Sequence, residues 1–216
     1  MNTVMNKTIY LRSILVLTLF SFSQLKSQVA EEWVQRYNGV GNNYDQASSM
    51  VVDGSGNIYV TGSSWGGPTQ ESSDYATIKY NSTGEQQWVE YYNGPANNAD
   101  AANAIAVDDS GNVYVTGGSR FGAVIGTENY ATVKYNSTGE RQWIAFYNGP
   151  GNYSDYGNSI AVDDSGNVYV SGTSYGSGTV SDYATIKYNS LGVQQWVARY
   201  NGPGNGNDVS YSIALD

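Results

Sequence analysis

The sequence predicts an all-β fold built from repeated four-stranded units, and three observations carry this prediction. Four tryptophans fall 55, 55 and 53 residues apart, at Trp33, Trp88, Trp143 and Trp196. Gly-Asn pairs keep the same interval, at Gly56-Asn57, Gly111-Asn112 and Gly166-Asn167. No helical periodicity appears after residue 27. A fixed period of this size indicates a repeat architecture, in which each unit buries its apolar faces against its neighbours.

One unit, residues 100–148, contains four short strand patterns joined by turn signals. The patterns are AANAIAV at 101–107, VYVT at 113–116, YATVKY at 130–135 and QWIAFY at 142–147. The turn at 108–112 (DDSGN) and the turn at 136–140 (NSTGE) place glycine where a positive φ is wanted. Four-stranded units of this length, packed radially, make a β-propeller. A linear β-solenoid or a row of sandwiches is the alternative.

The phase of the repeat divides residues 28–216 into three complete units and two partial ones. The complete units are about 45–93, 100–148 and 155–201. Residues 31–38 match a fourth strand, and residues 209–216 match a first strand. The simplest interpretation is a piece of a longer propeller. The rival interpretation is a short chain that self-associates through its open strand edges, since unpaired edges favour association.

Residues 1–27 have the pattern of a secretory signal peptide. Lys7 and Arg12 precede the apolar run 14–20, and a small and polar stretch follows as far as Ser27. The run is too short to span a bilayer comfortably. We expect cleavage after Ser27 and no membrane span in the mature chain, with a retained membrane anchor as the alternative.

Charge and composition exclude several classes of partner and chemistry. Removal of 1–27 takes three of the 10 basic residues and none of the 19 acidic ones, which leaves a net charge of −12. Such a chain repels phosphate backbones and anionic membranes, so nucleic acid is not expected as a partner. The sequence has no cysteine and no histidine. Catalysis would therefore have to use carboxylates, tyrosine or lysine, and no cofactor is expected.

The ordered motifs of the unit resemble a known family. The string DDSGNVYVTG is followed by DYATIKYNS with a tryptophan shortly after it, and then by YNGP and an aspartate. This order resembles the bacterial SBBP-type β-propeller repeat over essentially all of residues 31–216, and more distantly the NHL-type blade. Asn129 departs from the pattern, since the other units carry Asp74 and Asp182 there. The resemblance implies exported or cell-surface bacterial proteins, mostly without an assigned activity.

Residues repeated in every unit are expected to be structural. One set of aspartates opens each unit, and a second set precedes each Gly-Asn turn: Asp45, Asp100, Asp155 and Asp208; Asp53, Asp108, Asp163 and Asp216. We interpret them as turn residues that bond nearby backbone amides. Alternate oxygen ligands also make Asp53, Asp108 and Asp163 weak calcium candidates. The repeated tryptophans are expected to pack between blades.

Variable aromatic residues mark a candidate ligand-binding face. In a propeller the loops joining strands two and three share a face with the loops between blades. That face gathers Trp65, Arg120, Phe121, Tyr175, Tyr44 and Tyr153. Aromatic rings beside amide and carboxylate groups suit recognition of a glycan or a peptide. Ordinary surface-loop chemistry is the alternative.

Two functions from different classes fit these features. The first is an exported, non-catalytic scaffold, adhesion or ligand-recognition module at the cell surface. The second is the propeller part of a carbohydrate-active enzyme, a glycoside hydrolase or lyase. Such chemistry needs two acidic side chains at a set separation. The unrepeated acids Glu71, Glu90 and Glu128 are the candidates, and nothing in the sequence brings them together.

Overall fold

The computed structural model describes residues 31–66, 72–122 and 126–216, and this part of the chain is all-β. None of these residues forms a helix, so no helix among them is long and apolar enough to cross a membrane. The predicted signal peptide at 1–27 and the acid Glu71 lie outside the described residues. From Trp33 to Asp216 the chain forms one unit.

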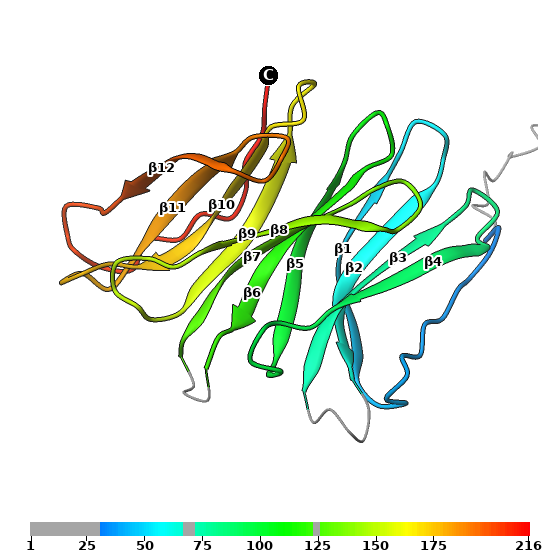
Figure 1. Cartoon of the computed structure of the whole chain (residues 1–216), viewed down its shortest axis with the longest axis horizontal. Coiled ribbons are helices and arrows are strands. Elements are labelled where there is room, and N and C mark those ends of the chain that lie inside the picture. The colour runs from blue at the N-terminus through cyan, green and yellow to red at the C-terminus, as the bar shows by residue number, and fades with distance from the viewer. Residues whose placement is uncertain (1–30, 67–71, 123–125) are drawn as a thin grey trace, which may run out of the picture. The chain divides into compact units, whose positions relative to one another are not determined.

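Within these described ranges, twelve strands form three antiparallel sheets of four, each in simple sequence order (Figure 1). The first sheet contains β1 (Asp45–Val52), β2 (Ile58–Trp65), β3 (Ser73–Tyr80) and β4 (Gln86–Tyr92). The second contains β5 (Asp100–Val107), β6 (Val113–Arg120), β7 (Glu128–Tyr135) and β8 (Arg141–Tyr147). The third contains β9 (Asp155–Val162), β10 (Val168–Tyr175), β11 (Ser181–Tyr188) and β12 (Gln194–Tyr200). These are the four-stranded blades that the repeat predicted.

Side chains of the turn itself close the hairpin between the first two strands of each sheet. In the second sheet, Asp108 Oδ1 accepts hydrogen bonds from the backbone amides of Ser110 and Asn112, at 3.0 and 2.9 Å. Gly111 has a φ of +77°, a conformation that costs glycine little and other residues more. This geometry is the reason why Asp and Gly-Asn recur at the same interval in the sequence.

A bulge interrupts the first strand of each sheet and requires a glycine in the strand beside it. The register shifts between Ala102 and Ala104 in β5, and between Ser171 and Gly172 where β10 pairs with β9. A Cβ on Gly172 would collide with the backbone carbonyl of Tyr156 and approach the Tyr130 hydroxyl at 2.8 Å. Gly172 is therefore fixed by the close approach of two strands and of a side chain from the preceding sheet.

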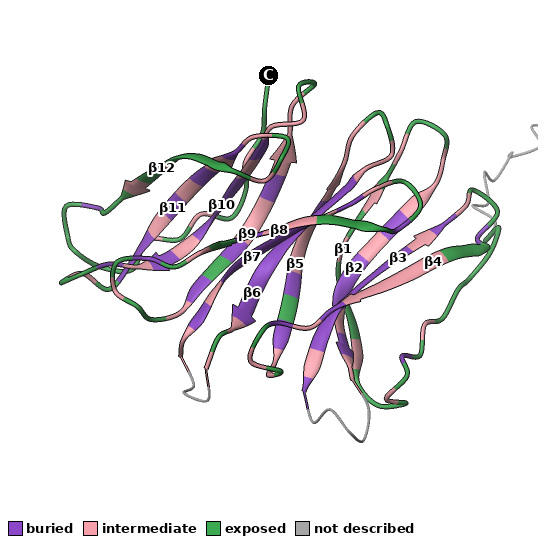
Figure 2. Cartoon of the chain, viewed as in Figure 1, coloured by how far each residue is buried: buried purple, intermediate pink, exposed green. Residues whose placement is uncertain are grey.

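Adjacent sheets pack face to face, and tyrosines of one sheet enter the core of the next. Strand β5 packs against β1, β2 and β3, and β9 packs against β5, β6 and β7. Fully buried Tyr59 and Tyr75 of the first sheet join Val113, Val115 and Val133 of the second in one core cluster. The central sheet is accordingly the most buried in Figure 2, whereas β1 is largely exposed.

Two of the repeated tryptophans, Trp88 and Trp143, lie between sheets, as predicted, whereas Trp33 and Trp196 are exposed at the two ends. Trp143 of β8 rests on the turn between β11 and β12, where its indole N–H donates to the Ser190 carbonyl at 3.1 Å. A Cβ on Gly192, whose φ is +78°, would lie only 2.7 Å from the Trp143 ring. Trp88 makes the same contact with the next sheet at Ser137 and Gly139.

Several further side chains donate hydrogen bonds forward, from one sheet to a backbone carbonyl of the next repeat. The hydroxyl of Tyr75 reaches Ala131 at 3.2 Å, and that of Tyr130 reaches Ala184 at 3.3 Å. At the bulge, the Asn103 amide donates to Gly157 at 3.0 Å. Each interface therefore combines an apolar core with directed polar contacts.

The three sheets do not close into a ring, and a short segment lies against the open face at each end. On the first sheet, Trp33 covers Gly84 as Trp88 covers Gly139. On the third sheet, Asn158 donates to the Ser210 carbonyl as Asn103 donates to Gly157. Strands were expected at 31–38 and 209–216. Both segments lie where those strands would be, but neither is paired in a ladder.

Candidate functional site

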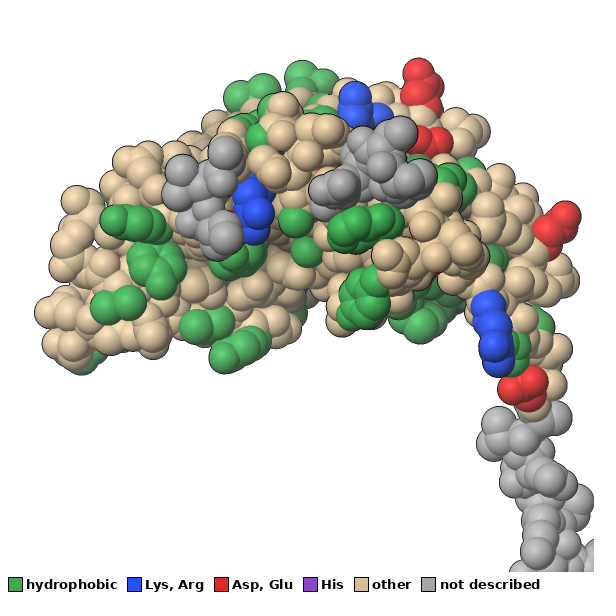
Figure 3. Space-filling view, turned by 90° about the horizontal axis from the view of Figure 1, so that it is seen from below, with side chains coloured by type: hydrophobic (Ala, Val, Ile, Leu, Met, Phe, Trp, Pro, Cys, Tyr) green, Lys and Arg blue, Asp and Glu red, His purple; other side chains and the backbone are tan. Residues whose placement is uncertain are grey.

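The candidate site occupies the end of the molecule where the loops joining β2 to β3, β6 to β7 and β10 to β11 meet the loops between sheets. We call this end the loop face. Figure 3 views the molecule from this side, and hydrophobic side chains form several separate groups on it. The three groups described below contain the six candidate residues.

The aspartates that open each sheet hold the loops between sheets in place. Asp155 Oδ2 accepts from the Gly149 amide at 2.7 Å, and its Oδ1 accepts from the Tyr175 amide at 3.1 Å. Burial raises the pKa of Asp155, and these hydrogen bonds oppose the shift. Asp45, Asp100 and Asp208 bond the glycine of the preceding loop in the same way. These carboxylates are structural supports of the loop face.

The weak calcium candidates use their oxygens within their own turns. Asp108 Oδ2 accepts hydrogen bonds from the side-chain amide of Asn112 at 2.8 Å and from the Tyr114 hydroxyl at 2.9 Å. Partial burial favours a higher pKa, but the hydrogen bonds from Asn112, Tyr114 and Ser110 outweigh it and lower the pKa of Asp108. Asp53 and Asp163 have matching partners. The described ranges contain no group of three acidic residues arranged to hold a metal ion.

Four of the six candidate residues form two local pairs, Tyr44 with Trp65 in the first sheet and Tyr153 with Tyr175 in the third. In the first, the Trp65 amide donates to the Tyr44 carbonyl at 3.1 Å, and the Tyr44 hydroxyl donates to Gln46 at 2.8 Å. In the third, the rings of Tyr153 and Tyr175 lie 5.8 Å apart. Tyr44 and Tyr153 are 60% and 62% exposed, so both pairs present aromatic surface to solvent.

Arg120 belongs to a structural bridge between sheets. Its guanidinium contacts Glu128 Oε1 at 3.1 Å, and the Ser154 hydroxyl donates to Glu128 Oε2 at 2.6 Å. Burial of Glu128 favours a higher pKa, but the hydrogen bonds from Ser154 and Arg120 outweigh it and lower the pKa. Since Ser154 immediately precedes β9, its hydrogen bond to Glu128 ties the start of β7 to the third sheet. The ion pair with Glu128 holds Arg120, at the end of β6, beside this contact.

Phe121 pairs with a residue that sequence reasoning missed. Its ring meets that of Phe146 edge to face, with centroids 4.7 Å apart and planes at 86°. Both rings are more than one third exposed. Phe121 also lines a hollow of about 290 Å³ with Gly122, Thr127, Asn129, Asn148 and Asn152. The Asn148 amide donates to Asn152 Oδ1 at 2.9 Å, which orients both side chains.

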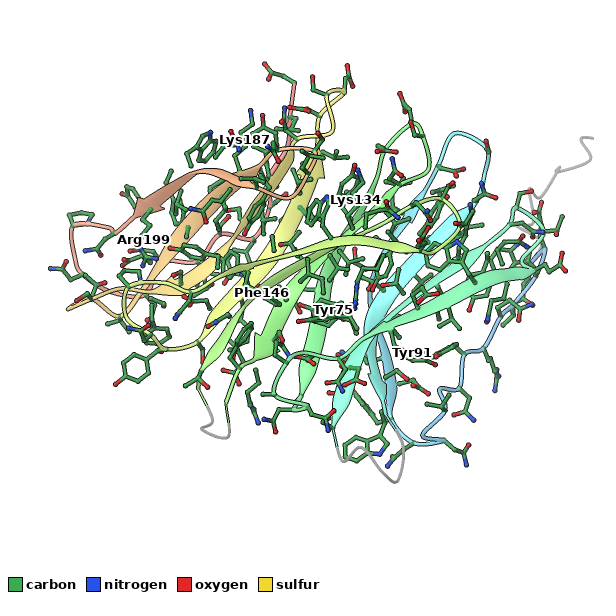
Figure 4. All side chains as sticks on the ribbon, in the orientation of Figure 1. Tyr75, Tyr91, Lys134, Phe146, Lys187 and Arg199 are labelled. Atoms are coloured by element: carbon green, nitrogen blue, oxygen red, sulfur yellow. The ribbon has the colours of Figure 1, made fainter. Side chains whose placement is uncertain are left out.

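Near this hollow the second sheet differs from the other two sheets at two positions of the repeat. The fourth strands carry Tyr91, Phe146 and Arg199 at one position (Figure 4). In the third sheet Arg199 Nη2 contacts Asp182 Oδ2 at 2.9 Å. The second sheet has Asn129 in place of Asp182 and Phe146 in place of Arg199, so an amide and a ring replace the ion pair. The departure at Asn129 was visible in the sequence and was the available signal.

The structure therefore separates the six predicted residues into three groups. Tyr44 lies with Trp65, Tyr153 lies with Tyr175, and Phe121 joins Phe146 and the asparagines near the Arg120–Glu128 bridge. Of the six predicted residues, Phe121 is the one that lines a described pocket, and the side-chain amides of Asn129, Asn148 and Asn152 line the same hollow.

Comparison with protein families gives a result consistent with this architecture. A family model described as the SBBP β-propeller repeat matches residues 32–68, 87–119 and 142–178. Each match begins one residue before a repeated tryptophan and ends near the end of the second strand of the following sheet. The comparison with curated proteins gives no match. The fold, the repeat interval and the three matches agree, and the chain belongs to the SBBP β-propeller repeat family.

Proposed function

We propose that this protein is an exported, non-catalytic recognition module at the cell surface, and that it binds a glycan through the hollow beside Phe121. Its repeat architecture is that of a binding scaffold. The signal-peptide pattern at 1–27 supports export, and the acidic mature chain supports a partner other than nucleic acid.

The observation that carries the proposal is the pairing of rings with amides in the second sheet. Sugar rings present C–H faces that pack on aromatic side chains, and hydroxyl groups that bond amides. Phe121 and Phe146 supply exposed aromatic edges, and Asn129, Asn148 and Asn152 supply donors and acceptors. A volume of about 290 Å³ suits a single sugar residue or the end of a chain.

The arrangement of the acids gives less support to a carbohydrate-active enzyme. Glu128 is engaged by Arg120 and Ser154, and Glu90 lies on β4 of a different sheet. Turnover on a polysaccharide panel that disappears in Glu128→Gln would contradict the non-catalytic proposal. Turnover retained in that variant would contradict it too, and would direct attention to other carboxylates.

Removing Phe121, which lines the hollow, or Phe146, which packs against Phe121, is expected to weaken glycan binding without unfolding the protein. On a glycan array and in titration with a positive glycan, Phe121→Ala and Phe146→Ala should each lose about tenfold or more in affinity. Their melting temperatures should stay close to wild type, because both rings are partly exposed. Tyr44→Ala is the matched control, since it removes an exposed ring of another group on the loop face.

The array result decides between ligand classes. If the folded protein binds no glycan on the array, the proposal is contradicted. If it binds only to a peptide array, the ligand is a peptide and not a glycan. Loss of binding in Tyr44→Ala, with Phe121→Ala unaffected, would move the site to the first sheet.

Export is expected to expose a defined new N-terminus. Cleavage after Ser27 leaves Gln28 as the first residue. N-terminal sequencing of protein recovered from the surface or the medium of expressing cells measures this directly. Uncleaved protein retained in the cytosol would contradict the export part of the proposal.

A further inference from the structure

The two end sheets present opposite halves of the interface that joins the sheets inside the chain. In each internal interface, aromatic residues of one sheet cover aliphatic residues of the next. Those aromatic residues are Tyr59, Tyr75, Trp88 and Tyr92 in the first interface, and Tyr114, Tyr130, Trp143 and Tyr147 in the second. The first sheet has a free aliphatic half, and the third sheet has a free aromatic half.

The free aliphatic half lies on β1 to β3 of the first sheet. Met50 is 61% exposed, whereas its equivalents Ile105 and Ile160 are both 8% exposed. Ala47 is exposed, although its equivalent Ala102 is fully buried. A cavity of about 500 Å³ opens here, and its lining includes Ala47, Met50, Ile58, Val60, Ala76 and Ile78. We call these six residues the aliphatic face.

The free aromatic half lies on the third sheet. Tyr200 is 48% exposed, while its equivalent Tyr92 is 2% exposed. Trp196 is 43% exposed, because within the chain it has no following turn of the kind that carries Trp143. Tyr169 and Tyr183 are also less buried than their counterparts in the other sheets. We call Tyr169, Tyr183, Trp196 and Tyr200 the aromatic face.

The segments that lie on these faces at present are weakly held. Residues 33–38 and 209–216 form no strand ladder, and most of them are exposed. Trp33, Val34 and Tyr211 are 36%, 57% and 81% exposed. Each segment replaces one strand of a neighbouring sheet. A whole sheet would bury more apolar surface, and buried apolar area drives association.

We propose that two copies of this chain associate head to tail, with the aromatic face of one copy docked on the aliphatic face of the next. In this complex Tyr169 and Tyr183 enter the cavity as Tyr59 and Tyr75 enter the core of the second sheet. Trp196 takes the place of Trp33 over Gly84, and β1 takes the place of residues 209–216. The internal interfaces of the chain thus provide the geometry of the external one.

This association is independent of the proposed glycan site, which lies on the loop face of the second sheet. A contact between two different faces is heterologous, so every docked copy leaves both kinds of face available at the ends of the assembly. The assembly therefore grows with concentration unless the geometry closes it into a ring.

Charged substitutions on the two faces test the proposal in sedimentation velocity. Met50→Glu and Tyr200→Glu each replace an exposed residue, so both proteins should fold, and each alone should be monomeric. An equimolar mixture should form a 1:1 heterodimer, because the first variant keeps its aromatic face and the second keeps its aliphatic face. Leu191→Glu, at a 75% exposed turn position outside both faces, should behave as wild type.

A matched pair of tryptophans tests the displacement of residues 33–38. Trp196→Ala removes a ring of the aromatic face, so this variant should associate at least about tenfold more weakly than the wild-type protein. Trp33→Ala removes the ring that competes for Gly84 and should strengthen association. Circular dichroism of both variants confirms that the sheets are intact.

Three outcomes would overturn the proposal. A wild-type protein that remains monomeric at concentrations up to about 1 mM contradicts the docking of the two faces. Association that survives in Met50→Glu or Tyr200→Glu, or a mixture that fails to form heterodimers, rules out the head-to-tail contact. Weaker association of Trp33→Ala would show that residues 33–38 belong to the interface and are not displaced.

Discussion

Trp143→Ala is expected to destabilise the protein by about 3–5 kcal/mol, because it empties a site between two sheets. The ring packs against Tyr114 and Tyr188, and its N–H bonds the Ser190 carbonyl. Its removal leaves a cavity over Gly192 and a carbonyl without this donor. Urea unfolding monitored by circular dichroism measures the loss.

The repeat supplies its own control for this substitution. Trp196 occupies the same position in the third sheet and contacts Tyr169, but it has no following turn beneath it and is 43% exposed. Trp196→Ala, measured at a concentration where the protein is monomeric, should cost less than about 1 kcal/mol. Trp65→Ala, on the loop face, should cost about 0.5 kcal/mol or less. Equal losses at Trp143 and Trp196 would contradict the role of the inter-sheet contact.

Asp182→Asn is expected to cost about 2–4 kcal/mol, since it leaves the guanidinium of Arg199 without its carboxylate partner. Arg199 keeps its bonds to Tyr147 and Ser174, which limits the loss. The double variant Asp182→Asn with Arg199→Phe copies the amide and ring of the second sheet and should recover part of the stability. A double-mutant cycle in urea measures the coupling; additive losses would contradict it.

The equivalent substitution in the first sheet should act in the opposite direction at neutral pH. Burial, and secondarily the charge of Asp100, raises the pKa of Asp74 from 3.8 to about 7. The folded state therefore holds this proton more tightly than the unfolded chain. The stability that Asp74 contributes is fully present below about pH 4 and is lost as pH rises through 7.

Asp74→Asn removes that loss, so the variant should match wild type at pH 4. At pH 8 it should be more stable by about 1–2 kcal/mol, after allowance for solvent screening. Wild type measured at each pH is the reference, because Asp100 and Asp155 also have raised pKa values. A variant that is less stable than wild type at pH 8 would contradict this sign.

The sequence was sufficient to predict the sheets because the turn chemistry repeats. Asp108 and Gly111 determine a hairpin locally, and alternation on either side of it determines the strands. The tryptophans were also predictable, since a large ring at one fixed position in every unit implies a repeated contact. The sequence could not predict that residues 209–216 form no strand ladder, because a ladder depends on a partner strand as well as on the segment itself.

The candidate site was predicted in part. Phe121 and Arg120 were singled out, but the bridge from Arg120 to Glu128 and Ser154 joins residues distant in sequence. Phe146 was overlooked because it lies in a strand pattern that repeats. Its importance comes from a difference at one position, where Tyr91 and Arg199 stand in the other sheets. The signal for Phe146 in the sequence is therefore this single difference between otherwise matching strands.

The forward direction of the inter-sheet hydrogen bonds bears on how the chain is made. Tyr75, Trp88 and Asn103 all donate to carbonyls of the repeat that follows them. Synthesis runs in the same direction, so each repeat leaves the ribosome before the acceptors of its own side chains exist. A nascent sheet therefore gains its last stabilising contacts only when its successor emerges, and consolidation should advance one repeat behind elongation.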